Sequence, residues 1–148
     1  MHNNYQINTL LPEIIVFCSA IFLLTYGAFS KKRSFINVNL LTILTLFVAS
    51  ISLFFINSDT SAFNNSFVNN NLTIHIKLFV LIISTIVVYI SSSYLKKNEL
   101  NLFEYPILLL FSILGMLVMI SSNDLIMLYI SIELQSLALY VLVALKKS

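Results

Sequence analysis

Hydrophobic residues along the chain form five long stretches that are separated by short polar segments. Each stretch is long enough to cross a bilayer as a helix, which takes roughly 20 apolar residues. Apolar positions within a stretch are nearly continuous and do not alternate with polar ones, which argues against a membrane β-barrel. The pattern predicts an all-α integral membrane bundle with five transmembrane helices, in one membrane domain over residues 1–148. The predicted helices cover residues 10–29, 35–56, 72–95, 103–121 and 124–145.

The composition agrees with a membrane protein. The chain is 59% hydrophobic and 9% charged, with a mean hydropathy of +0.96, so a globule of this size cannot bury its apolar surface. A net charge of only +2 argues against a nucleic-acid partner. Cys18 stands alone and can form neither an internal disulfide nor a metal site by itself. Abundant Phe, Ile, Asn and Tyr with scarce Gly and Pro are typical of an AT-rich genome, such as that of an organelle.

The basic residues fall on one side of the predicted bundle. They follow the first, third and fifth predicted helices, whereas the connections 57–71 and 121–123 contain no Lys or Arg. Because basic loops stay on the side from which a membrane protein is inserted, we expect the N-terminus outside and the C-terminus inside, on the matrix or cytoplasmic side. The asparagine-rich segment 57–71 is expected to be a polar loop. The seven basic residues that follow these helices are Lys31, Lys32, Arg33, Lys96, Lys97, Lys146 and Lys147, and the eighth basic residue, Lys77, lies within the third predicted helix.

Glu133 is the acidic residue that lies deepest in a predicted helix. It lies nine residues, or about 14 Å, beyond Asp124, close to the middle of a hydrocarbon core of about 30 Å. Tyr129, Ser136 and Tyr140 share its helical face and form a polar stripe. A charged group there is costly and indicates a function, so we expect Glu133 to handle protons. The alternative is a protonated glutamate that only hydrogen-bonds a neighbouring helix.

Lys77 and His75 lie near the outer end of the third predicted helix. For His75 we expect a position at the membrane interface, where a polar side chain meets water. Lys77 lies about two turns inside the helix and has two interpretations. Its side chain either extends to the interface, or it lines a polar seam or contacts a partner as an accessory residue.

Two acidic residues accompany the prolines that mark predicted helix starts. Glu13 follows Pro12 and Glu104 precedes Pro106. Proline suits the first helical turn, and a carboxylate there favours the helix dipole. We therefore expect structural roles for both carboxylates, with contact to a neighbouring subunit as the alternative.

Small residues mark one face of the fourth predicted helix. Ser112 and Gly115, three residues apart, form a smooth patch that allows another helix to approach closely. The fourth helix is therefore expected to serve as a scaffold for the bundle.

Several motifs resemble one family of membrane proteins. Residues 103–147 contain LGM, then SSNDL at a turn, then IELQSLALYVL, and LLPEI at 10–14 and LTIHIKLFVLIIS at 72–84 add weaker support. Together they resemble chain 2 of mitochondrial NADH:ubiquinone oxidoreductase, an antiporter-like subunit of the membrane arm of respiratory complex I. The resemblance extends over the whole chain and is strongest in its last third.

This resemblance implies a role in proton translocation coupled to NADH:ubiquinone electron transfer, in the mitochondrial inner membrane. It places Glu133 on the family's glutamate of helix five, whose partner is a lysine on a broken helix seven. Because the sequence ends before such a helix, we expect a split subunit with a separate chain that carries the remaining helices and the lysine. Other membrane-arm subunits and lipids would complete the surroundings. The chain itself is expected to bind no redox cofactor, because FMN, iron–sulfur clusters and ubiquinone belong to other parts of the complex.

Three other functions are compatible with parts of the sequence. A fragment of a multisubunit cation/proton antiporter would carry the same acid, and co-purification with respiratory subunits would decide between the two. A small drug/proton exchanger would place its glutamate on the first helix instead of the fifth. A purely structural or assembly subunit would use Glu133 only to fix helix register, and replacing Glu133 with Gln would then leave proton pumping unchanged.

Overall fold

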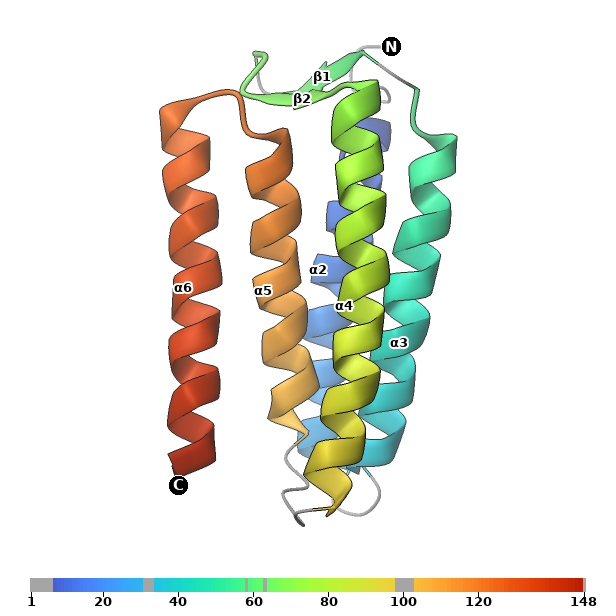
Figure 1. Cartoon of the computed structure of the whole chain (residues 1–148), viewed down its shortest axis with the longest axis vertical. Helices are drawn as coiled ribbons and strands as arrows, with labels where there is room; N and C mark the ends of the chain where they lie inside the picture. The colour runs from blue at the N-terminus through green and yellow to red at the C-terminus, as the bar shows by residue number, and fades with distance from the viewer. Residues whose placement is uncertain (1–6, 31–33, 58, 63, 98–102, 148) are drawn as a thin grey trace.

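The computed structural model describes the chain except for residues 1–6, 31–33, 58, 63, 98–102 and 148. Five helices run roughly parallel to one long axis (Figure 1). Their length and hydropathy allow all five to cross a membrane, so the predicted all-α membrane bundle is confirmed. The helices are α2 (Leu11–Phe29), α3 (Ser34–Ser52), α4 (Asn71–Lys97), α5 (Glu104–Ser121) and α6 (Leu125–Lys147), with a short 3₁₀ turn η1 (Leu53–Phe55) after α3.

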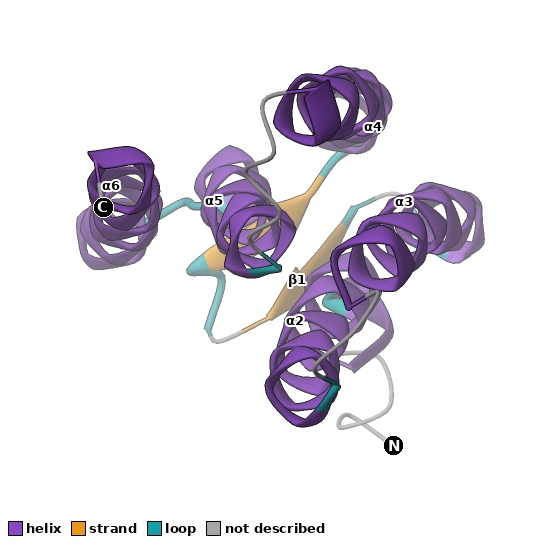
Figure 2. Ribbon diagram, turned by 90° about the horizontal axis from the view of Figure 1, so that it is seen from below, coloured by secondary structure: helices purple, strands orange, loops and turns teal. Residues whose placement is uncertain are grey.

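Helix α5 lies at the centre of the bundle, as the view along the helices shows (Figure 2). It packs against α2, α4 and α6 and also touches α3, whereas α6 packs chiefly against α5. Gly115 allows the close approach of α6, because a Cβ at this position would lie 3.0 Å from the Ser131 carbonyl oxygen. Gly115, one of the two residues of the expected smooth patch, therefore lies at a helix–helix contact.

The segment between α3 and α4 differs from the expected loop. It forms an antiparallel hairpin of β1 (Thr60–Ala62) and β2 (Phe67–Asn69), with Ala62 opposite Phe67. Asn64 and Asn65 at its tip have positive φ angles of 53° and 66°. Asparagine tolerates this left-handed conformation better than most residues, so the asparagine-rich composition supports a tight turn.

The hairpin closes one end of the bundle and is held to the α5–α6 turn. The Asn123 backbone N–H donates to the Ser66 carbonyl oxygen (2.9 Å), and the Asn123 side chain donates to the Asn65 carbonyl oxygen (3.0 Å). Phe67 and Ser122 also form an isolated β-bridge. The short strands thus join the two helical connections at the same end of the molecule.

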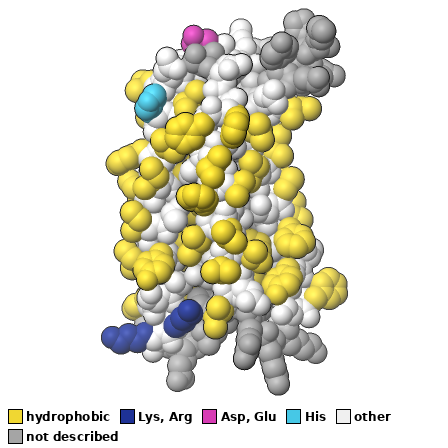
Figure 3. Space-filling model, turned by 90° about the vertical axis from the view of Figure 1, so that its right-hand side faces the viewer, with side chains coloured by type: hydrophobic (Ala, Val, Ile, Leu, Met, Phe, Trp, Pro, Cys, Tyr) yellow, Lys and Arg dark blue, Asp and Glu magenta, His cyan; other side chains and the backbone are white. Residues whose placement is uncertain are grey.

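Side chains on the outer surface match a membrane environment. Apolar groups cover the middle of the bundle, with basic side chains near one end and acidic ones at the other (Figure 3). Lys96 and Lys97 lie in the last turn of α4, at the end opposite the hairpin. The predicted basic residues Lys31, Lys32 and Arg33 lie outside the described residues. The chain is a multi-pass membrane protein by this architecture, and the orientation of its termini stays a prediction.

Candidate functional site

Glu133 lies on the exposed face of α6, directed away from the rest of the bundle. Ser131 and Ala138 are buried against the bundle, at 1% and 5% exposure. Glu133 is two residues, about 200° of helical rotation, from Ser131, and its side chain is exposed. Within the described part of the chain, no side chain forms a hydrogen bond or an ion pair with the Glu133 carboxylate.

The residues predicted to share the Glu133 face do so in the structure. Tyr129 and Tyr140 are 66% and 70% exposed, and Ser136 is partly buried. The polar stripe therefore runs along the outer surface of α6 and does not line a channel inside these five helices. Any group that pairs with Glu133 has to approach this surface from outside the described residues.

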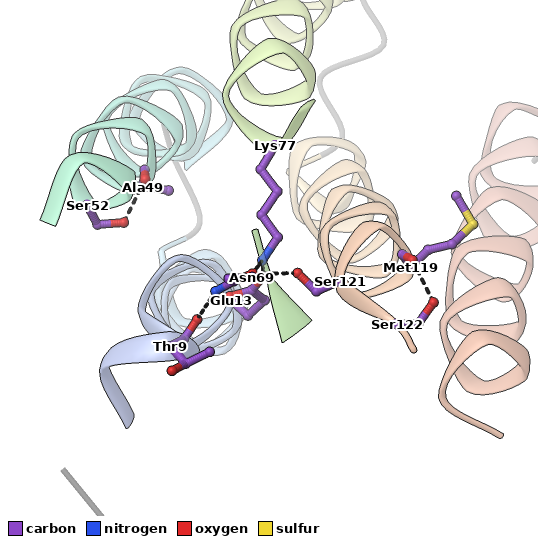
Figure 4. A network of polar contacts seen from close by, with 9 residues as sticks. All are labelled: Thr9, Glu13, Ala49, Ser52, Asn69, Lys77, Met119, Ser121 and Ser122. Carbon is purple, nitrogen blue, oxygen red and sulfur yellow. Dashed lines mark hydrogen bonds and ion pairs between the residues drawn. The ribbon is translucent and has the colours of Figure 1, made fainter. Parts of the chain in front are cut away.

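A second pair of charged residues lies inside the bundle. Lys77 on α4 is fully buried and forms an ion pair with Glu13 in the first turn of α2, itself 5% exposed. The sequence allowed two interpretations of Lys77. The one in which its side chain extends to the membrane interface is wrong, because the side chain is buried. The side chain points inward between the helices, along a polar seam (Figure 4). Glu13 lies at the start of a helix as expected. Its role is not limited to the helix end, because its buried carboxylate pairs with Lys77.

Asn69 of β2 connects this ion pair to the rest of the bundle. Lys77 Nζ donates to Asn69 Oδ1 at 3.0 Å, and Ser121 Oγ at the end of α5 donates to the same oxygen at 2.8 Å. The Asn69 side-chain amide donates to the Thr9 carbonyl oxygen at 2.8 Å. The network therefore joins the start of α2, the hairpin, α4 and the end of α5.

An aromatic ring completes the surroundings of the lysine. The Lys77 ammonium lies 4.7 Å from the centre of the Phe67 ring, within the range of a cation–π interaction. Phe67 is 1% exposed and belongs to the same strand as Asn69. The sequence did not indicate Phe67, Asn69 or Ser121 as site residues. A signal was present in α4, where Ser84 and Ser92 share a buried face with Lys77, because small polar residues mark buried faces in membrane helices.

The remaining candidate residues lie at the helix ends. His75 is exposed, and its ring Nδ1 lies 2.6 Å from the Asn71 carbonyl oxygen. Glu104 is partly buried in the first turn of α5, where a carboxylate suits the helix dipole. Among the described residues, no three His, Cys, Asp or Glu side chains lie close enough to hold a metal ion.

Comparison with known proteins identifies a set of bacterial relatives. The chain is 43% identical over 139 residues to NADH-quinone oxidoreductase subunit N of Pelagibacter ubique, covering 93% of this chain and 29% of the relative. It is 42% identical over 135 residues to the subunit N of Paramagnetospirillum magneticum, covering 90% and 28%. Subunit N 1 of Rhizobium meliloti is 37% identical over 137 residues, covering 93% and 28%. No family model matches the chain. The chain thus spans less than a third of the length of these curated relatives.

Proposed function

Because the chain is a homologue of NADH-quinone oxidoreductase subunit N over less than a third of that subunit's length, we propose that it forms part of an antiporter-like subunit in the membrane arm of respiratory complex I. In this role it contributes to proton translocation coupled to electron transfer from NADH to quinone. The observation that carries the proposal is the similarity over about nine-tenths of the chain, at 43% identity to one relative. Glu133 supplies the chemistry, as the glutamate that this family is expected to carry on helix five.

The position of Glu133 supports a partner outside these 148 residues. A carboxylate that faces lipid near the middle of a bilayer costs about 2.5–3.5 kcal/mol on insertion scales. An approaching cation offsets this cost, and the charge state of the carboxylate then depends on the cation's distance. In our proposal a lysine from further helices, carried by a separate chain, covers the exposed face of α6. Movement of this lysine would exchange a proton with Glu133.

The five described helices would act mainly as a scaffold for this pair. Tyr129, Ser136 and Tyr140 lie on the same face as Glu133 and can hydrogen-bond water or a partner helix along the proton path. Electron transfer would take place on other subunits, which would hold FMN, iron–sulfur clusters and ubiquinone. We propose the mitochondrial inner membrane as the location, on the grounds of the organelle-like composition.

Two experiments test this function. Native separation of the membrane complexes, with mass identification of the chains, should find this protein with respiratory subunits and with a chain that carries the remaining helices. Co-purification with cation/proton antiporter subunits would instead favour the antiporter alternative. In the assembled complex, Glu133→Gln should lower the number of protons moved per electron while the complex still assembles.

Glu104→Gln is the matched control for Glu133→Gln. It removes the same charge from the end of a neighbouring helix, and proton translocation should remain close to that of the unmodified complex. If Glu133→Gln assembles and pumps normally, the role of Glu133 is refuted and the purely structural alternative is favoured.

A further inference from the structure

The buried Lys77 ammonium has a partner for each of its three N–H groups. Glu13 Oε1 and Asn69 Oδ1 accept hydrogen bonds, and the face of the Phe67 ring lies 4.7 Å away. Two of these partners are neutral, and both belong to the strand β2. These two contacts hold the Lys77 ammonium in place independently of the charge on Glu13.

The Glu13 carboxylate is only half satisfied. Oε1 accepts from Lys77, whereas Oε2 is buried and has no hydrogen-bond partner among the described residues. Buried carboxylate oxygens nearly always have a partner, so an open one indicates a bound water or a proton. The neighbouring Asn69 side chain is hydrogen-bonded through both of its polar atoms, because its oxygen accepts two hydrogen bonds and its amide donates to Thr9.

We propose that Glu13 Oε2 is a proton-binding site inside this chain, with Lys77 as a fixed counter-charge and a hydronium ion as the proton donor. A hydronium ion that reaches the site gives its proton to Oε2 and leaves as water, so that an O–H bond forms on Glu13. Lys77 remains an ammonium ion, held by Asn69 and Phe67. The pair changes from neutral to a single positive charge, and release of the proton reverses the step.

The pair lies close to the hairpin end of the bundle. Glu13 is the third residue of α2, and Lys77 lies six residues, about 9 Å, beyond the start of α4. The other titratable groups described at this end are occupied or exposed. His75 contacts Asn71, Asp124 accepts from Ser66, and Asp59 is exposed. In the described part of the chain, Lys77 and Glu13 thus face no other charged side chain.

This site is separate from Glu133 and does not depend on the function proposed above. Glu133 lies on the outer face of α6, whereas Glu13 and Lys77 lie between α2 and α4, in the interior of the bundle. The two carboxylates can therefore be titrated and substituted independently.

Infrared spectroscopy of the purified native complex, recorded as a function of pH, tests the proposal. The unmodified protein should show a carboxylic-acid band that grows as the pH falls and that disappears in Glu13→Gln. Glu13→Asp should restore a titrating band at a shifted frequency, and Lys77→Met should change the pH range over which the Glu13 band appears. Glu104→Gln is the control for a carboxylate at a helix end and should leave this band unchanged.

Two outcomes overturn the proposal. If the spectra of the unmodified protein and Glu13→Gln agree at every pH, Glu13 binds no proton. If Glu13→Gln does not assemble, the spectra are recorded on the charge-free double variant Glu13→Gln/Lys77→Met. Loss of the carboxylic-acid band in this variant supports the proposal, whereas a band that persists, or failure of this variant to assemble as well, refutes it. Failure of proton translocation in Glu133→Gln bears on the proposed function and leaves the Glu13 band unaffected.

Discussion

Replacing Lys77 with Met tests the energetic role of the buried ion pair. Methionine keeps the unbranched shape and most of the volume, so repacking alone should cost less than about 1.5 kcal/mol. The larger cost comes from Glu13, which is 5% exposed and would lose the hydrogen bond and the opposite charge that Lys77 provides. Removing one partner of a buried pair typically costs about 3–5 kcal/mol. Protonation of Glu13 removes the unpaired charge and limits the loss of stability, so we expect Lys77→Met to be destabilised by about 3 kcal/mol.

The double variant Glu13→Gln/Lys77→Met separates the pair from the packing. With both charges removed no buried charge is left uncompensated, and such replacements are often close to neutral. We therefore expect the double variant to be more stable than Lys77→Met alone. The free energy of unfolding can be measured by denaturant titration in mixed micelles, on the protein purified with its partners and followed by circular dichroism.

Lys96→Met serves as the control for Lys77→Met. Lys96 is exposed in the last turn of the same helix, so its replacement should change stability by no more than about 0.5 kcal/mol. If Lys77→Met costs as little as Lys96→Met, or if the double variant is no more stable than Lys77→Met, then the ion pair is not what holds these segments together.

Two further predictions concern helix packing and orientation. Gly115→Val should destabilise the α5–α6 contact by about 1–3 kcal/mol, because even the first added carbon would lie 3.0 Å from the Ser131 carbonyl oxygen. Gly115→Ala should have a smaller effect in the same unfolding assay. If both variants are as stable as the unmodified protein, the close packing at Gly115 is contradicted. A cysteine introduced at Asn65, in the hairpin, should react with a membrane-impermeant thiol reagent from the outer side, and one at Lys97 only from the inner side; the reverse pattern would show that the orientation is wrong.

The five helices were predictable because the length of an apolar stretch is a direct physical requirement of the bilayer. The predicted span 103–121 corresponds to α5 at Glu104–Ser121, and Pro106 near its start is a local signal. The hairpin was not predictable in the same way. Its strands have three residues each, and an asparagine-rich segment is compatible with either a turn or an open loop.

The ion pair was missed because its two residues are 64 positions apart in the sequence. Each residue alone fits a local role, Glu13 as a helix-start carboxylate and Lys77 as an interfacial lysine. Which face of α4 turns toward α2 depends on how all five helices pack, and no local pattern determines this. Glu133, in contrast, is a candidate from its depth alone, because a charge in the middle of an apolar stretch is costly in any arrangement of the helices, and its role stays a prediction.

The uneven burial of the helices indicates where the further helices of the proposed subunit would bind. In the most apolar part of α5, half of the residues are buried by the rest of the bundle. In the most apolar part of α6, only 17% of the residues are buried. Exposed faces of α2 and α3 consist largely of apolar side chains that lipid can cover, such as Phe22 and Phe47. The α6 face carries a carboxylate between exposed tyrosines, and lipid tails offer it neither a hydrogen bond nor a cation. Lipid can therefore cover the exposed faces of α2 and α3, but it offers no partner to the Glu133 carboxylate on α6, and this is why we propose that further helices pack against the α6 face.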